Sequence, residues 1–395
     1  MSVVKEGWTY KTFGEVGSFL RGKSIQKADF VEKGLPCIHY GQIHTKFGIS
    51  VEKHLSEIPV EIYEKSIIAS PGDVIIAITS EDLDGSCKST AWLGSYDVAV
   101  SAHAAVFKHN LNPKFIAYYL RSNSFYSEKG KYARGFKVME IKTTDIARIP
   151  LPVPPLPTQQ SIVSELDKIN ELIALKKSQL KDLDFLAQSI FYEMFGDPVT
   201  NEKGWEVKKW NQLFDTKLGK MLDKAKQNSE ARIYPYLANF NIQWGSFDLS
   251  DLRQMPFTDN EIEKYKLKKG DLMICEGGES GRCAIWPGSD SIILFQKAVH
   301  RARIKDNSAV DIMYIKFFME YAKKGGGLKD YISKSTIEHL TGEKLNMVPI
   351  PLPPLSLQLQ FAERVEAIER MKQQVQTAIK DLETLLASRM QYWFD

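Results

Sequence analysis

The sequence contains one unit of about 198 residues twice, and this duplication constrains the fold more than any other feature. The halves align with a shift of 197 to 199 residues. The matching segments are Gly7-Trp8 with Gly204-Trp205, Gly72-Asp73 with Gly270-Asp271, and IPLPVPPL at 149–156 with VPIPLPPL at 348–355. In both halves a Gln and a long helical pattern follow the prolines. We therefore expect a globular unit, a proline segment and a helix, and then the same three parts again.

The proline segments mark the boundaries between these parts. Alternating Pro and Leu removes backbone N–H donors and holds φ near −65°, which disfavours both a helix and a central strand. A rigid spacer is the simplest interpretation. The predicted boundaries are 1–147 for the first globular unit, 148–199 for its proline segment and helix, 200–347 for the second globular unit and 348–395 for the second proline segment and helix.

Each proline segment is followed by apolar residues in steps of four and three, the heptad pattern of a coiled coil. The pattern lasts about four heptads, and a helix of about 33 residues is roughly 50 Å long. Thr158 and Ser356 are the expected N-caps, and Gly196-Asp197-Pro198 is expected to end the first helix. The main seam positions are Ile162, Leu166, Ile169, Leu180 and Leu183 in the first helix and Val365, Ile368, Ile379 and Leu382 in the second.

Each helix needs a partner that covers its apolar stripe, and the other copy is the obvious one. Because the globular unit between them must return the chain, we expect an antiparallel coiled coil with a pseudo-twofold axis. The predicted fold class is α/β, with two globular units of short strands and helices joined by two long antiparallel helices. In each unit an apolar run follows a Gly-Asp turn, and a shorter helix is expected near Pro113–Ser122 in the first unit and near Asp311–Tyr321 in the second. Lys176 and Lys372 interrupt the seam, and either their stems extend out of it or they set its register.

The sequence lacks the motifs of an enzyme that works alone. It has no dinucleotide-binding Gly-x-Gly-x-x-Gly, no P-loop and no Asn/Asp-Pro-Pro-Tyr/Phe tetrapeptide of an amino-methyltransferase. No Pro-Asp precedes Glu140-Ile141-Lys142 at a distance that would complete a nuclease site, and Cys37, His39 and His44 form no paired metal motif. We therefore predict a binding protein with no catalytic residue, no metal site and no cofactor of its own.

The composition places the chain in a reducing compartment. A hydrophobic fraction of 43% with 26% charged residues is that of a globular protein, and four cysteines in 395 residues do not form a disulfide framework. The N-terminus has no apolar leader pattern, and no run of 18 apolar residues occurs. We expect a cytoplasmic protein without a membrane span.

The formal charge of +3 is unevenly distributed along the chain. The globular units 1–147 and 200–347 carry +2 and +4, whereas the proline and helix segments carry −2 and −1. Basic, amide and aromatic residues also alternate within the globular units, a mixture suited to phosphate contacts and base-edge hydrogen bonds. The candidate DNA-binding residues are Gln42, His44, Lys46, Arg134, Lys137, Asn241, Gln243, Arg282, Gln296, Lys297, Arg301, Lys334, Ser335, Thr336 and His339.

Taken together, these residues resemble the DNA specificity subunit of type I restriction-modification enzymes. The resemblance covers essentially the whole chain. It rests on the repeated IPLPVPPLPTQQSIV and VPIPLPPLSLQLQFA, each leading into a heptad helix, on the Gly-Trp that opens each unit, and on the closing segment KSTIEHLTGEKLNMVPIPLPP at 334–354. LSLQLQ in the second copy departs from the more common Pro-x-x-Gln-Gln.

The resemblance implies two target recognition domains, each of which reads one half of a bipartite, asymmetric site in double-stranded DNA. The helix pair would set the spacer length and bind two methyltransferase subunits. These would supply S-adenosylmethionine and adenine methylation, while motor-endonuclease subunits would supply ATP- and Mg2+-dependent translocation and cleavage. The expected docking residues on the helices are Leu172, Leu175, Phe185, Phe191 and Phe195, unless they are core residues against the globular units.

Two other classes of function remain open from the sequence. One is a self-sufficient DNA-modifying enzyme, which would bind a metal or S-adenosylmethionine as an isolated chain. The other is a coiled-coil scaffold that binds protein and has no affinity for duplex DNA.

Overall fold

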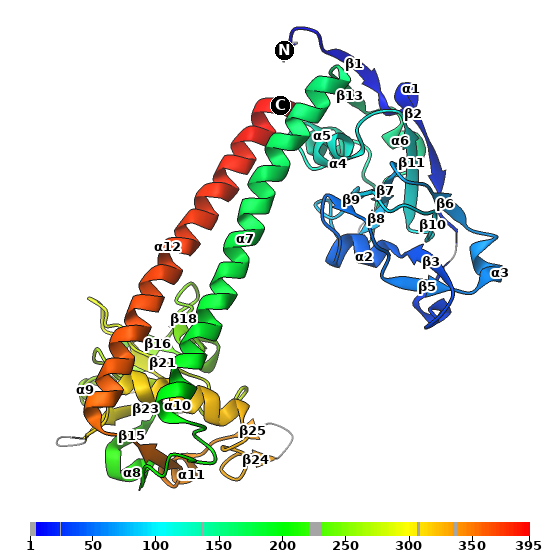
Figure 1. Ribbon diagram of the computed structural model, residues 1–395. Coiled ribbons are helices and arrows are strands. Elements are labelled where there is room, and N and C mark those ends of the chain that lie inside the picture. The colour runs from blue at the N-terminus through cyan, green and yellow to red at the C-terminus, as the bar shows by residue number, and fades with distance from the viewer. Residues whose placement is uncertain (1–4, 24, 136–137, 222–230, 306–308, 335–337) are drawn as a thin grey trace. The chain divides into compact units, whose positions relative to one another are not determined.

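The computed structural model describes residues 5–23, 25–135, 138–221, 231–305, 309–334 and 338–395. It divides into two compact units, Met1–Ser178 with Gln376–Asp395, and Gln179–Val375. Helices α7 (Leu156–Phe195) and α12 (Leu355–Phe394) contribute residues to both units (Figure 1). The four boundaries drawn from the sequence remain predictions, because this division follows packing and not the order of the repeat.

Both long helices begin earlier than expected. The first helical amides, of Thr158 and Leu357, donate to the carbonyls of Pro155 and Pro354 at 2.9 Å. Thr158 and Ser356 therefore lie inside the first turn, and their prediction as N-caps is wrong. Proline suits this position because it needs no N–H there and its carbonyl accepts the first helical bond. The predicted end of α7 is confirmed, since Gly196 follows Phe195 with a φ of +75°.

In each unit the two long helices lie antiparallel. In the first unit, Glu165 bonds to Arg389, and Lys177 lies 2.9 Å from Glu383. In the second unit, Asp184 lies 2.8 Å from Lys372. As the residue numbers increase along α7, those of the contacting residues in α12 decrease, so the two helices run in opposite directions in each unit. The predicted seam residues Ile162, Leu166, Ile169, Leu183, Val365, Ile368 and Ile379 are buried, and Leu180 and Leu382 are half-buried.

The first unit contains two larger sheets and two short ribbons. One sheet has the order β2-β11-β7-β9-β4, and the other has the order β5-β3-β10-β6. The strands are β2 (Gly17–Arg21), β3 (Leu35–Ile38), β4 (Ser50–Val51), β5 (Ser56–Ile58), β6 (Ile67–Ala69), β7 (Val74–Ala77), β9 (Ser89–Trp92), β10 (Val98–Val100) and β11 (Ala104–His109), with ribbons β1 (Thr9–Thr12) on β13 (Pro150–Val153) and β8 (Thr79–Ser80) on β12 (Met139–Glu140). The shorter helices are α1 (Phe13–Val16), α2 (Tyr40–Thr45), α3 (Val60–Tyr63), α4 (Pro113–Tyr119), α5 (Asn123–Gly130) and α6 (Thr143–Ile146), with the 3-10 turn η1 at Lys27–Asp29.

The second unit repeats this plan in a reduced form. Its sheets have the orders β15-β23-β20-β21 and β19-β16-β22. The strands are β15 (Phe214–Leu218), β16 (Arg232–Leu237), β19 (Arg253–Phe257), β20 (Leu272–Cys275), β21 (Cys283–Ile285), β22 (Leu294–Phe295) and β23 (Val299–Ile304), with ribbons β14 (Glu206–Lys209) on β26 (Pro349–Leu352), β17 (Ile242–Gln243) on β18 (Ser246–Phe247), and β24 (Ser333–Lys334) on β25 (Glu338–His339). The helices are α8 (Trp210–Leu213), η2 (Asn239–Asn241), α9 (Asp259–Tyr265), α10 (Ile312–Lys324) and α11 (Gly342–Asn346).

The repeated Gly-Asp pair makes the same turn in both units. Gly72 and Gly270 have φ values of +95° and +89°, which favour glycine. Asp73 accepts the Ser70 amide and pairs with Lys108 at 2.6 Å. Asp271 likewise accepts the Lys268 amide and pairs with Arg303 at 2.6 Å. The turn predicted from sequence is thus held in each copy by a buried aspartate and a basic residue on the neighbouring strand.

A buried glutamine ties each proline segment to its globular unit. Gln159 accepts the Asn112 amide at 2.9 Å and donates to the Pro154 carbonyl at 2.8 Å. Gln358 accepts the Asp311 amide at 2.8 Å and donates to the Pro353 carbonyl at 2.7 Å. Because Asn112 and Asp311 are the N-caps of α4 and α10, one side chain joins the start of a long helix to the start of a domain helix.

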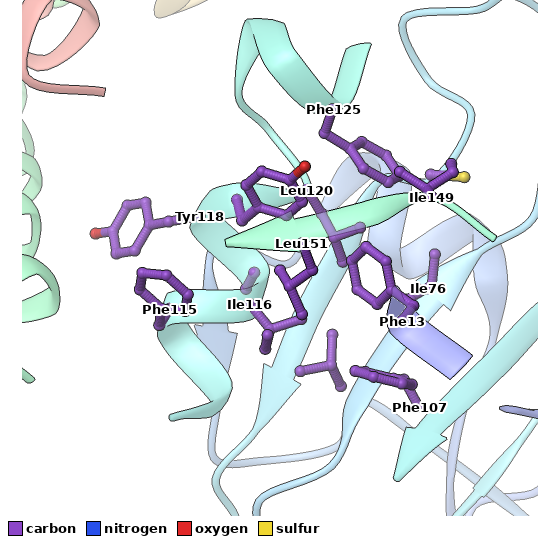
Figure 2. Close-up of a cluster of buried hydrophobic side chains, with 14 of the residues drawn as sticks. Phe13, Ile76, Phe107, Phe115, Ile116, Tyr118, Leu120, Phe125, Ile149 and Leu151 are labelled. Carbon is purple, nitrogen blue, oxygen red and sulfur yellow. The ribbon is translucent and has the colours of Figure 1, made fainter. Parts of the chain in front are cut away.

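The ends of the long helices complete the cores of the units. In the first unit, Ile162, Leu166 and Phe394 join the cluster that Figure 2 shows in part, around Phe13, Phe107 and Phe115. In the second unit, Phe191, Phe195 and Phe361 pack against the aromatic rings of α10. Burial of one such aromatic or aliphatic side chain contributes about 1.5–3 kcal/mol. The helices are thus anchored at both ends by apolar packing.

Equivalent lysines cap the two long helices. The Lys203 ammonium donates to the carbonyls of Glu193 and Met194 at the end of α7. The Lys5 ammonium donates to the carbonyls of Tyr392 and Trp393 at the end of α12. A cation at the C-terminus of a helix stabilises the exposed carbonyls there. The chain near residue 5 therefore meets α12 in the way that the chain near residue 203 meets α7.

Candidate nucleic-acid interface

The first unit brings two of the predicted DNA-binding clusters together at the ribbon β8–β12. The His44 Nε2 lies 3.1 Å from the Thr79 carbonyl oxygen, and Thr79 pairs with Glu140 across the ribbon. Arg134 pairs through its backbone with the other side of Glu140. Segments that are 90 residues apart in the sequence thus become neighbours. Lys46 and Arg134 are exposed there.

A cleft of about 1010 Å³ opens beside this ribbon. Its lining includes α2 (Tyr40, His44), the loop after β8 and the first turn of α5. The basic residues of its wall are held by main-chain oxygens. Lys88 donates to the His44 carbonyl at 2.7 Å, Lys129 to the Ser86 carbonyl at 2.6 Å, and Arg121 to the Ser89 carbonyl at 3.0 Å. Burial lowers the pKa of Lys88, Lys129 and Arg121. These three cations fix the shape of the cleft.

The second unit builds the same arrangement with different side chains. Gly277 pairs with His339 as Thr79 pairs with Glu140, and the Asn239 amide lies 3.4 Å from the Gly277 carbonyl. Arg282 donates to the Asn239 carbonyl at 2.9 Å and to the Glu279 carboxylate at 3.2 Å. The Trp244 indole N–H donates to the same carboxylate at 2.6 Å.

The backbone hydrogen bonds identify Lys88 and Arg282 as equivalent residues. The Ala77 amide donates to the Lys88 carbonyl at 2.8 Å, and the Cys275 amide donates to the Arg282 carbonyl at 2.8 Å. In both units the basic side chain donates to a carbonyl in the segment that follows an equivalent strand. Lys88 donates to the His44 carbonyl after β3, and Arg282 donates to the Asn239 carbonyl after β16. The sequence prediction included Arg282 but missed Lys88, Arg121 and Lys129. Aligning the two Gly-Asp turns places Lys88 opposite Trp286, because the loop of the second unit is four residues shorter, so the sequence repeat did not mark Lys88.

Three of the predicted DNA-binding residues are held inside the units. Asn241 accepts the Ala238 amide and donates to the carbonyls of Asp248 and Asp251, so its amide group is fully used. Arg301 is buried and pairs with Asp215 at 2.6 Å. Gln42 accepts the His39 amide and donates to Ser56 at 2.7 Å. The expectation that Asn241 and Arg301 face DNA is wrong, because both side chains are buried: the Asn241 amide bonds to main-chain groups, and Arg301 pairs with the Asp215 carboxylate.

The remaining DNA-binding candidates differ in exposure. Gln243 and Lys297 are exposed, and Gln296 and His339 are half-buried. Lys137, Ser335 and Thr336 lie outside the described residues, and Lys334 is described only through its backbone in β24. Burial lowers the pKa of His300, whose Nε2 lies 3.0 Å from the Leu340 carbonyl oxygen.

The candidate docking residues on α7 fall into two groups. Leu172, Leu175 and Phe185 are exposed, at 47%, 66% and 66%. Phe191 and Phe195 are buried against Tyr314, Tyr321 and Phe361, so they belong to the core of the second unit. The docking prediction is wrong for these two residues. Of the seam lysines, Lys372 is half-buried and pairs with Asp184 and Glu369.

Three further features bear on what the chain can bind. Within the described part of the chain, no group of three or more His, Cys, Asp or Glu side chains is placed to hold a metal ion. The four cysteines are buried thiols, and burial raises the pKa of Cys37 and Cys87 to about 12. Among the described residues, no helix combines the length and apolar character needed to cross a membrane.

The comparison with protein-family models also finds two copies of one domain in the chain. The family model for the type I restriction modification DNA specificity domain matches the chain twice, over residues 5–183 and 202–383. The chain belongs to the type I restriction-modification specificity subunits. Each match includes one globular unit, its proline segment and most of the following helix.

Relatives and solved structures of this family span the whole chain. The EcoKI specificity subunit of Escherichia coli (strain K12) is 21% identical over 97% of this chain and 87% of its own length. The MjaVIII specificity subunit of Methanocaldococcus jannaschii is 22% identical over 97% and 92%. Among solved structures, a chain from a study of assembly and conformational transition of the type I R-M system has a TM-score of 0.67 at 18% identity, covering 100% of this chain and 99% of that one. The S subunit from M. genitalium has a TM-score of 0.54 at 13% identity, covering 99% and 96%. These structures share the fold.

Proposed function

We propose that this specificity subunit reads a bipartite, asymmetric site in double-stranded DNA, with one half-site read by each globular unit. The observation that carries the proposal is the repeated arrangement of ribbon, turn segment and basic residue, built with different side chains in the two units. A common backbone that presents different side chains is what two domains need in order to read two different sequences. The excess of positive charge on both globular units supports contact with phosphates.

An exchange of residues 1–147 for the corresponding domain of another specificity subunit tests this proposal. Cells that express the chimera with the methyltransferase subunits would be examined by methylome sequencing. We expect one half of the methylated motif to change and the other half to stay the same. A change in both halves would contradict the modular assignment. Absence of any affinity for duplex DNA at low salt, with the methyltransferase present, would favour a protein-binding scaffold.

We also propose that the helix pair sets the spacer between the half-sites and forms a coiled coil. The antiparallel contacts in each unit support this interpretation. Insertion of four residues into α7 alone adds about 6 Å of helix. The tolerated spacer should then lengthen while both half-sites stay unchanged. A methylated motif with its original spacer would exclude the role of the helices in spacing.

The exposed apolar residues of α7 are the proposed docking surface for the methyltransferase subunits. Leu172 and Leu175 are exposed and lie three residues apart, so they share one face of α7, and adjacent exposed apolar side chains are typical of protein contacts. The variant Leu172→Glu/Leu175→Glu should lose co-purification with the methyltransferase. The matched control is Leu55→Glu, at an equally exposed leucine of the first globular unit. Retention of the methyltransferase by the double variant would remove these residues from the docking surface.

We assign the chemistry of the complex to its other subunits. In this proposal S-adenosylmethionine is held by the methyltransferase subunits, and ATP and Mg2+ act on the motor-endonuclease subunits. Titration calorimetry of the purified chain with S-adenosylmethionine or Mg2+ should give no binding heat. A saturable signal with either one would favour the alternative of a self-sufficient DNA-modifying enzyme.

A further inference from the structure

The loop that follows β8 differs between the units although its surroundings are the same. On one side, the amides of Cys87 and Gly281 donate to the carbonyls of Ala77 and Cys275, at 2.8 and 2.9 Å. On the other side, the amides of Ile141 and Leu340 donate to the carbonyls of Ile78 and Glu276, at 3.0 and 2.8 Å. Between these fixed points the first unit has residues 79–86, and the second unit has only residues 277–280.

The longer loop forms one side of the cleft in the first unit. Thr79, Ser80, Glu81, Asp82 and Asp84 all line the cleft. Two of the three carboxylates are used within the unit. Asp82 accepts the Gly85 amide at 2.7 Å, and Asp84 accepts a hydrogen bond from Tyr126. Glu81 is exposed and forms no hydrogen bond or ion pair with any residue that the structure describes. Its carboxylate is therefore an acceptor at the edge of the cleft that no described residue occupies.

The corresponding carboxylate of the second unit is already occupied. Glu279 lies in the short loop and accepts from the Trp244 indole and from Arg282. The lysines that line the same cleft have other partners. Lys88 and Lys129 donate to main-chain carbonyls, and neither forms an ion pair with the Glu81 carboxylate. The two units therefore differ at equivalent positions between the same backbone contacts. The Glu279 carboxylate has partners within its unit, and the Glu81 carboxylate has none among the described residues.

A carboxylate that faces DNA accepts hydrogen bonds and repels phosphate, so it discriminates among base edges. In the major groove, cytosine N4 and adenine N6 are amino donors, whereas guanine O6 and N7 and thymine O4 are acceptors. We propose that Glu81 is a specificity-determining residue of the first unit and accepts a hydrogen bond from an exocyclic amino group in its half-site. This inference rests on the proposed function, and it adds the residue and the class of base edge that the residue recognises.

Methylome sequencing of cells that express the full chain with its methyltransferase subunits tests the inference. Glu81→Gln retains the size of the side chain but adds a donor, so one position of one half-site should become degenerate. Discrimination at that position should fall by roughly tenfold. Glu81→Lys reverses the chemistry, and the preference at the same position should move toward guanine. Glu61→Gln, an exposed carboxylate on α3 that does not line the cleft, is the matched control and should leave the motif unchanged.

The outcomes separate this inference from the proposed function. An unchanged motif in both Glu81 variants, or an equal loss of methylation at all sites, would overturn the role of Glu81 in specificity while leaving the bipartite assignment intact. A wild-type chain that directs no methylation and binds no duplex DNA would instead remove the proposed function. Because Glu81 is exposed, the melting temperatures of the variants should equal that of the wild type, and this measurement verifies that they are folded.

Discussion

Replacing the buried glutamine of the second proline segment should destabilise the second unit. The Gln358 side chain accepts the Asp311 amide at 2.8 Å and donates to the carbonyls of Pro353 at 2.7 Å and Ala309 at 3.2 Å. Gln358→Ala removes these three bonds and leaves the Asp311 amide without its partner. Each of the three lost bonds contributes roughly 0.5–1.5 kcal/mol, so we expect a total near 3 kcal/mol.

This loss should be visible in thermal unfolding. At roughly 2–4 °C per kcal/mol for a unit of this size, the melting temperature should fall by roughly 6–12 °C. Gln360→Ala is the matched control, because Gln360 is exposed on the same turn of α12. A loss equal to that of the control would refute the interpretation that Gln358 holds the proline segment to α10. Gln159→Ala should have the same effect on the first unit.

Three further outcomes follow from burial and charge. Phe191→Ala should cost about 3–5 kcal/mol in urea unfolding, because Phe191 is fully buried among aromatic rings. Phe185→Ala at a 66% exposed position should cost less than about 0.5 kcal/mol, and equal losses would contradict the assignment of Phe191 to the core. Burial lowers the pKa of His109 to about 4 from 6.5, so the neutral ring stabilises the first unit fully above pH 6.5 and loses this contribution as the pH falls toward 4. His109→Gln should reduce the loss of stability over this range, and an unchanged pH profile would exclude His109 as its source.

The elements that the sequence predicted well are those whose chemistry is local. Proline removes a donor wherever it stands, the heptad spacing is visible along one helix, and the turns at Gly72 and Gly270 require a positive φ in any context. These local rules predicted the long helices, the turns and the domain helices α4 and α10. The start of α7 was misplaced because a proline is tolerated in the first turn of a helix, where no N–H donor is needed, so the helix already begins at Leu156 and includes Pro157.

The interface was predicted less well because it depends on strand neighbours. Lys88 has no aromatic or amide neighbour in the sequence that would mark it, and only the pairing of β7 with β9 brings it to the cleft. Asn241 and Arg301 are residue types typical of DNA-binding sites, but both are buried in the second unit, where Asn241 donates to main-chain carbonyls and Arg301 pairs with Asp215. Phe191 lies on a helix face whose exposure depends on α10, which is more than 100 residues away in the chain.

The main-chain frame around the loops at 79–86 and 277–280 is compatible with wide sequence divergence. Its equivalent contacts join amide to carbonyl: Ala77 to Lys88 and Cys275 to Arg282 on one side, and Ile141 to Ile78 and Leu340 to Glu276 on the other. Main-chain bonds of this kind place almost no requirement on side-chain identity. Substitutions and changes in loop length can therefore accumulate while the backbone path is kept. A relative can then align over 97% of the chain and still differ at about four positions in five. The few positions where a side chain is indispensable to the frame, such as Asp73 and Gln159, are those at which the two halves of this chain still agree.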